Sequence, residues 1–226
     1  MDVIPQSSLL LGIIPALILL YIGLKGYEGH YKEKNIFLTF VLGIILGFFA
    51  AISRLLINAP PLIVIYVILF PLFEQLFKTI VLNIGRLHEK RETTIYGLSL
   101  GLGFGSVFTP FLIIAGSSNL RGDIYSLSLI AIGSVGIILF HGATGAYIGY
   151  GIYVGKMTRY LMTAVIFQIP FNLIMDMTRI YPNDYVLELQ LGLVIYGGIV
   201  FWYVVKKIMP KILSRSRRRD ISRKSG

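Results

Sequence analysis

The chain has 226 residues, of which 55% are hydrophobic and 14% are charged, and its mean hydropathy is +0.76. About a quarter of the residues are charged in an ordinary soluble domain, so the composition excludes that class. Lys and Arg number 21 against 11 Asp and Glu, which gives a formal net charge of +10. In a chain this apolar, the excess base indicates membrane orientation and argues against nucleic-acid binding. The sequence predicts a multi-pass protein of an archaeal or bacterial cell membrane, in contact with the lipid bilayer.

Apolar runs near the roughly 20 residues that a span needs recur seven times, at 8–24, 36–53, 61–85, 95–116, 126–154, 160–178 and 186–205. The fold predicted from them is an all-α bundle of about seven transmembrane helices. The first run lacks a small-residue cleavage motif and contains Pro15, so it is expected to remain as a span. The predicted organisation is a transmembrane domain over 1–205 and a basic cytoplasmic tail over 206–226.

The distribution of basic residues predicts the orientation. Of the 21 Lys and Arg residues, 17 fall in the first, third and fifth joints and the tail. The opposite side has Arg54, Arg121 and Arg179, while Lys78 lies within a span. This asymmetry places the N terminus outside and the C terminus inside. The tail has nine bases and one acid and is expected to contact anionic lipids, with a cytoplasmic partner or RNA as the alternative.

In the third span, Glu74 and Lys78 stand four residues apart on one helical face. Two interpretations are open. The residues could neutralise each other as a structural pair, since Glu before Lys at this spacing is the favourable order. Alternatively, Glu74 lies about 20 Å from the outer end of the span, near mid-membrane, where an ionisable group often marks a functional site. Pro71 weakens the helix just before it, and Gln75 adds a donor and an acceptor.

The fourth span contains Gly97, Gly101 and Gly105 at intervals of four, and the second span contains Gly43 and Gly47. Small residues at this spacing predict close helix packing. The segment is not a nucleotide-binding loop, because it is hydrophobic and no phosphate-binding lysine follows it. Thr109 and Pro110 add a hydroxyl and a potential helix break near mid-membrane.

The fifth span carries His141 at a depth comparable to that of Glu74. A lone buried histidine is often a packing residue, but the matching depth would let His141 and Glu74 share a proton, a water or a metal ion. In the sixth span, polar residues recur at steps of four, four and three, as Gln168, Asn172, Asp176 and Arg179. We expect Asp176 and Arg179 to form a capping ion pair, and the other two to face the bundle interior.

The order of these motifs resembles the PrsW-like branch of the membrane proteases that includes the CAAX prenyl proteases. FEQLFK is similar to the family's Glu-Glu-x-x-Lys or Arg motif, and the glycine-rich fourth span precedes a histidine motif matched by LFHGATGAYIG. Gln168-x-x-x-Asn172 occupies the place of a His-x-x-x-Asn or Asp motif. The resemblance covers about residues 8–178. Gln75, Thr109 and Gln168 depart from the pattern, where the family has a second acid, an acidic or polar residue and a histidine.

The resemblance implies an intramembrane peptidase in which Glu74 is the general base, restrained by Lys78. His141 would orient water or help to bind a divalent metal such as zinc together with Glu74. Asn172 or Gln168 would then stabilise the oxyanion, and Gln75, Thr109 and Asp176 would complete the cavity around a transmembrane protein substrate. The departures equally allow an inactive member of the fold that acts as a membrane binding or assembly subunit. A proton-coupled transporter is the third alternative.

Overall fold

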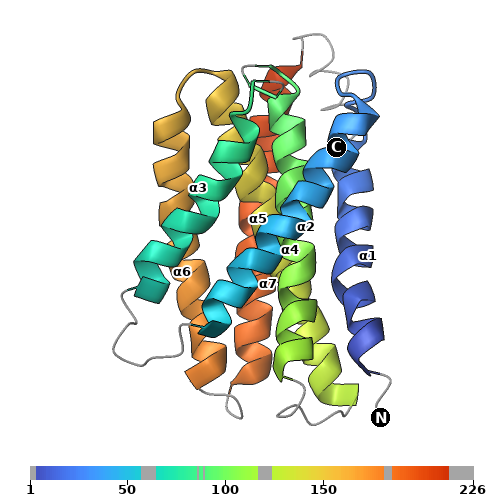
Figure 1. The fold of residues 1–226 in the computed structure, drawn as a ribbon, viewed down its shortest axis with the longest axis vertical. Coiled ribbons are helices and arrows are strands. Elements are labelled where there is room, and N and C mark those ends of the chain that lie inside the picture. Colours follow the sequence, from blue (N-terminus) through green and yellow to red (C-terminus); the bar gives the residue numbers. More distant parts are fainter. Residues whose placement is uncertain are drawn as a thin grey trace.

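The computed structural model describes residues 4–56, 65–85, 87–88, 90–116, 124–180 and 185–213, and every regular element within these ranges is helical. Figure 1 shows long helices running up and down the molecule. The α-helices are α1 (Ile4–Leu24), α2 (Glu33–Leu56), α3 (Phe70–Leu82), α4 (Thr93–Gly116), α5 (Ile124–Tyr153), α6 (Met157–Ile180) and α7 (Val186–Tyr203). The all-α prediction is thereby confirmed for the described residues.

Four helical segments are long and apolar enough to cross a membrane. They are Glu33–Arg54, Ser128–Tyr153, Met157–Thr178 and Val186–Ile212. Shorter apolar helical stretches occupy Leu10–Leu24 and Thr93–Phe108. Large apolar side chains also point outward, for example Ile18, Phe37 and Ile199, which are 54%, 72% and 60% exposed. An apolar exterior that encloses a set of buried polar side chains is the arrangement expected of a protein whose solvent is lipid.

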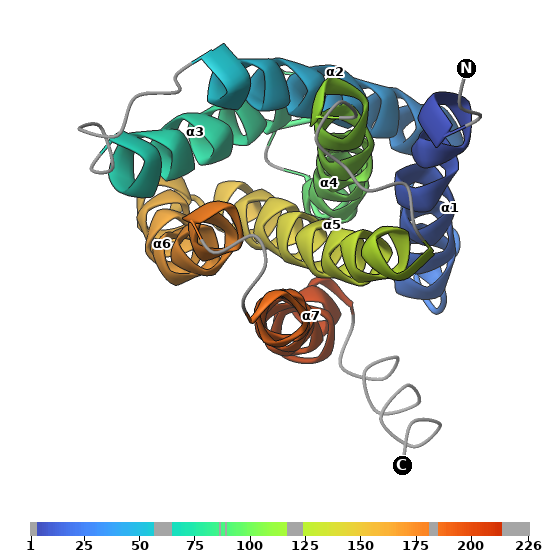
Figure 2. The same cartoon turned by 90° about the horizontal axis from the view of Figure 1, so that it is seen from below.

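Helix α4 lies between α2 and α5 (Figure 2), and its glycines make this position possible. A Cβ atom added to Gly97 would meet the backbone of Gly145 in α5, and one added to Gly101 would meet the backbone of His141. On α2, a Cβ atom at Gly43 would meet the backbone of Leu100. The close approach predicted from the glycine spacing is therefore confirmed, and it brings the backbone carrying His141 against α4.

The helical hydrogen bonding of the third span changes before Pro71, and α3 is regular through Pro71 and Glu74. Ile65–Leu69 forms a short π-helical segment, and α3 follows with Pro71 in its first turn. Proline is tolerated there because its missing N–H needs no partner in the first turn. At the other end of the chain, α7 continues through Val204–Ile208 into a short 3₁₀ helix at Met209–Ile212. Residues 214–226, the larger part of the predicted tail, lie outside the described residues.

Candidate functional site

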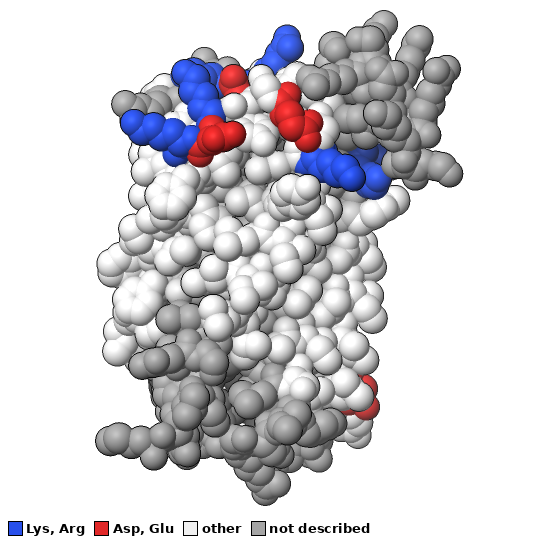
Figure 3. Space-filling model, turned by 90° about the vertical axis from the view of Figure 1, so that its right-hand side faces the viewer, with Lys and Arg blue, Asp and Glu red and all other residues white. Residues whose placement is uncertain are grey.

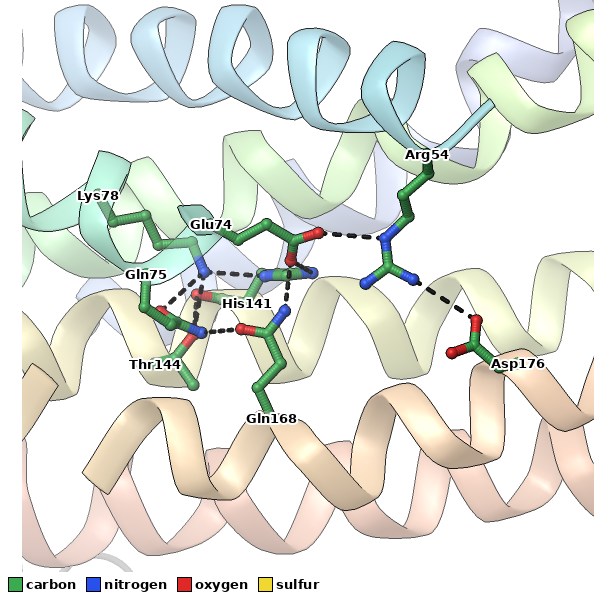
Figure 4. Close-up of polar contacts among 8 residues, drawn as sticks. All are labelled: Arg54, Glu74, Gln75, Lys78, His141, Thr144, Gln168 and Asp176. Carbon is green, nitrogen blue, oxygen red and sulfur yellow. Dashed lines mark hydrogen bonds and ion pairs between the residues drawn. The ribbon is translucent and has the colours of Figure 1, made fainter. Parts of the chain in front are cut away.

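A network of buried polar side chains crosses the interior of the bundle. Figure 4 shows these side chains converging from α2, α3, α5 and α6. The residues drawn are Arg54, Glu74, Gln75, Lys78, His141, Thr144, Gln168 and Asp176. All but Asp176 are at most 3% exposed, and Asp176 is 14% exposed. Polar groups removed from water this completely need partners, so their contacts define the chemistry of the site.

Lys78 lies at one end of this polar network and contacts three acceptors. Its Nζ atom lies 3.3 Å from Gln75 Oε1, 2.8 Å from His141 Nδ1 and 3.1 Å from Thr144 Oγ1. An ammonium group has three donors and no acceptor, so these contacts use its donors fully. With Lys78 as an ammonium, Nδ1 of His141 is the acceptor, which places the ring proton of a neutral imidazole on Nε2. Phe104 adds a cation–π contact, with Nζ 4.7 Å from the ring centroid.

Two glutamine amides connect Lys78 to Glu74 and form a hydrogen-bond relay, Lys78–Gln75–Gln168–Glu74. Gln75 accepts from Lys78 through Oε1 and donates through Nε2 to Gln168 Oε1 at 2.5 Å. Gln168 in turn donates from Nε2 to Glu74 Oε2. Because an ammonium can only donate and a carboxylate can only accept, the two ends of the relay fix the orientation of both amides. The relay needs one donor and one acceptor at each intermediate position, which an amide supplies and a second carboxylate does not.

Both carboxylate oxygens of Glu74 accept hydrogen bonds. Oε2 accepts from Gln168, and Oε1 lies 3.2 Å from Arg54 Nε, with which it forms an ion pair. Arg54 also lies 3.8 Å from Asp176, measured from Nη1 to Oδ1. The rings of Phe70 and Phe108 flank its guanidinium at 5.2 and 5.4 Å from their centroids. The guanidinium therefore joins two acidic residues from different helices inside an aromatic wall.

His141 lies beside Glu74, as the matching depth of the two residues predicts. Its Nε2 atom is 4.0 Å from Glu74 Oε2, which is an electrostatic contact and too long for a hydrogen bond. Aromatic rings surround the imidazole, with the centroids of Phe104 and Phe140 at 4.5 and 5.6 Å. The structure therefore brings the predicted pair together from α3 and α5, while the nearest oxygen of Glu74 is already bonded to Gln168.

One predicted ion pair needs correction. Glu74 does not pair with Lys78: it forms an ion pair with Arg54, and Lys78 binds uncharged acceptors. The i,i+4 spacing puts both residues on one face of α3, but Glu74 pairs with Arg54 from α2 and Lys78 contacts His141 from α5. Asp176 contacts Arg54, a partner that was not predicted. The predicted capping pair of Asp176 with Arg179 stays a prediction, because the side chain of Arg179 lies outside the described residues.

The sequence analysis missed two residues of this site. Arg54 was assigned to an outer joint, but it belongs to α2 and is 1% exposed. Its signal was weak, since an arginine at the end of an apolar run is usually a topological charge. Thr144 was also missed, although it stands one helical turn after His141 on the same helix. Among the predicted residues, Asn172 is fully buried on α6, and the side chain of Thr109 lies outside the described residues.

The residues around Glu74 and His141 do not fit a zinc ion. A catalytic zinc takes three protein ligands from His, Cys or carboxylate, and the described residues contain no group of three such side chains. The two candidate ligands are also in contact with cations, since Arg54 binds the carboxylate and Lys78 binds the imidazole. A metal cation at this point would be repelled by both groups.

Comparisons with protein families, with curated proteins and with solved structures give no match to this chain. The resemblance to the PrsW-like proteases therefore depends on the sequence motifs alone.

Proposed function

We propose that the chain is an integral membrane protein with seven spans, its N terminus outside the cell and its C terminus inside. Four helical segments have the length and apolarity of spans, and α1, α3 and α4 run alongside them in the same bundle. Exposed basic residues gather in the joints at one end of this bundle, including Lys25, Lys34, Arg91 and Lys156. The positive-inside rule assigns that end to the cytoplasm.

We further propose that the protein has a PrsW-like fold without hydrolytic activity, and that it serves as a binding or assembly subunit in the cell membrane. The observation that carries this proposal is that both oxygens of Glu74 are bonded within the protein, one to the guanidinium of Arg54 and one to the amide of Gln168. Each oxygen has a second acceptor position, so a water would have to share its oxygen of Glu74 with one of these donors. A general base must lie within hydrogen-bond reach of the water that it activates, and the present partners of Glu74 compete with that contact.

The departures from the family pattern support the same proposal. Gln75 and Gln168 stand where the resemblance implies an acid and a histidine, and here they donate and accept as consecutive members of one relay. A polar network in which every member has a partner rigidifies a core, and its cost rises steeply when one member is lost. Residues that would be defects in a peptidase thus make a coherent structural network.

The direct test compares the wild-type protein with Glu74→Gln in proteoliposomes that contain transmembrane peptides of varied sequence. We expect mass spectrometry to find no cleavage product that depends on Glu74. Native gels of gently solubilised host membranes are expected to show the chain in a complex heavier than its own 25.3 kDa. Cleavage by the wild-type protein that is lost in Glu74→Gln would overturn the proposal.

An intramembrane peptidase is the second candidate, and one observation favours it. Glu74 and His141 are buried and lie 4.0 Å apart, which is the pairing that the resemblance implies for water activation. In that case the guanidinium of Arg54 would have to leave Glu74 before a water could enter. Arg54→Gln should then raise the rate of Glu74-dependent cleavage, whereas an inactive scaffold would show none with or without this change.

A further inference from the structure

A second polar feature lies at the basic end of the bundle, away from the buried polar network around Glu74. It is a pocket of about 430 Å³ between the start of α2 and the start of α4. Three lysines, one glutamate, one asparagine and one tyrosine line it, namely Lys32, Lys34, Lys90, Glu92, Asn35 and Tyr96. Its volume is within the range of ordinary small-molecule sites.

Fixed hydrogen bonds shape this pocket before any ligand binds. Tyr96 is 2% exposed, and its hydroxyl oxygen accepts from the main-chain N–H of Lys32 at 3.1 Å and from Asn35 Nδ2 at 3.3 Å. These bonds join residues 61 and 64 positions apart in the sequence. The two helix starts are therefore held together, and the lysine backbones on the α2 side have a defined place relative to α4.

The charge of the lining favours an anion. The three lysines outnumber the single carboxylate of Glu92, and the described residues place no ion-pair partner on the ammonium groups of Lys32 and Lys34. Two helices, α2 and α4, also begin beside the pocket, and their dipoles add positive potential. Among the residues that Figure 3 colours by charge, Lys and Arg lie at one end of the visible face, together with Asp and Glu, above a broad uncharged band.

The level of the pocket relative to that band indicates the source of the anion. The apolar stretches Glu33–Arg54 and Thr93–Phe108 begin at the residues that line the pocket. In a spanning chain this is the depth of the lipid headgroups, whose phosphates lie where an apolar span meets water. Basic pockets between helix ends on the cytoplasmic side are suited to anionic headgroups.

We propose that this pocket is a specific binding site for the phosphate of an anionic lipid headgroup. Lys32, Lys34 and Lys90 would contact the phosphate, and Asn35 would donate to an ester or hydroxyl oxygen. The carboxylate of Glu92 would accept a hydrogen bond from a headgroup hydroxyl, which favours a glycerol headgroup such as that of phosphatidylglycerol. The site depends on the chain spanning the membrane, but it is independent of whether Glu74 is catalytic.

The test is native mass spectrometry of the full chain, titrated in detergent with phosphatidylglycerol or phosphatidylcholine. The test variant is Lys32→Ala with Lys34→Ala, because the bond to Tyr96 uses the main-chain N–H of Lys32 and survives the change. The control is Lys206→Ala with Lys207→Ala, which removes the same charge outside the pocket. Each basic residue near an anionic headgroup contributes about a fivefold factor in affinity, so we expect one phosphatidylglycerol to bind about 30-fold more weakly to the test variant.

A competition experiment with inorganic phosphate distinguishes the source of the anion. Displacement of phosphatidylglycerol only by phosphate far above the lipid concentration supports a lipid site. Tight phosphate binding that is lost in the test variant, with no phosphatidylglycerol bound, would overturn the lipid assignment in favour of a soluble phosphate compound. Equal lipid affinity in the test and control variants would overturn the site itself. If the double variant does not fold, Lys90→Ala probes the opposite wall of the pocket with the same expected direction.

Discussion

Arg54 Nε lies 3.2 Å from Glu74 Oε1, although 20 residues separate the two in the sequence, and the two side chains are 1% and 2% exposed. The contact joins the end of α2 to the middle of α3. It also places a permanent cation on the only carboxylate that the resemblance assigns as a catalytic base. The same contact therefore pairs a buried charge and supports the proposal that Glu74 is not a catalytic base.

Arg54→Leu should lower the free energy of unfolding by about 3 to 5 kcal/mol, because it leaves the buried carboxylate of Glu74 without its counter-ion. Thermal unfolding in detergent, followed by helical circular dichroism, measures the loss. Arg159→Leu, on the exposed start of α6, is the control and should change little. The double variant Arg54→Leu with Glu74→Leu should regain part of the loss, since the two apolar residues need no pairing while Gln168 and Asp176 still lose a partner. A single variant as stable as the wild-type protein would refute the ion pair.

Lys78→Met should destabilise the protein by about 2 to 4 kcal/mol, because three buried acceptors on Gln75, His141 and Thr144 lose their donor. The mechanism is distinguishable from simple neutralisation of Glu74. If Lys78 served only as a counter-ion, Glu74→Gln in the Lys78→Met background would restore stability. We expect no such rescue in chemical unfolding experiments, and a full rescue would show that charge balance is the dominant role of Lys78.

Gln168→Leu should cost about 2 to 4 kcal/mol, since it leaves Gln75 Nε2 and Glu74 Oε2 without the partner that joins them. Gln168→His should cost less than half as much, because an imidazole keeps one donor and one acceptor. Both variants can be compared by unfolding in the same detergent. Equal losses for leucine and histidine would mean that the hydrogen-bond relay contributes little and that side-chain volume decides the effect.

Gly101→Ala should destabilise the bundle by about 1 to 3 kcal/mol, because the added methyl group would meet the main-chain carbonyl of His141. The clash is with backbone, so α4 and α5 must separate. Gly198→Ala on α7 is the matched control, since a Cβ atom there meets nothing within 4 Å. That change should be neutral or stabilising by up to about 1 kcal/mol, because alanine favours the helix. Similar melting temperatures for the two variants would contradict the close packing.

Local pattern was sufficient to place the helices and much of their packing. Apolar runs near 20 residues have few alternatives in lipid, since an unpaired backbone is costly there. Glycines at steps of four could serve only close helix contact, which the packing of Gly97 and Gly101 confirms. The depth argument also brought Glu74 and His141 together, because depth in a span follows directly from residue count and helical rise.

Only the tertiary structure decided which polar groups are partners. Spacing along α3 favoured Glu74 with Lys78, but Arg54 from α2 contacts Glu74, and it also contacts Asp176 from α6. Residue count gives the depth of a side chain but not the direction in which its helix faces, and that rotation is set by packing against neighbouring helices. The sequence by itself thus determined the helices, their apolar character and the matching level of Glu74 and His141 along their helices. Packing determined that Glu74 is bonded to Arg54 and Gln168, since that outcome depends on three helices, α2, α3 and α6, meeting at one point.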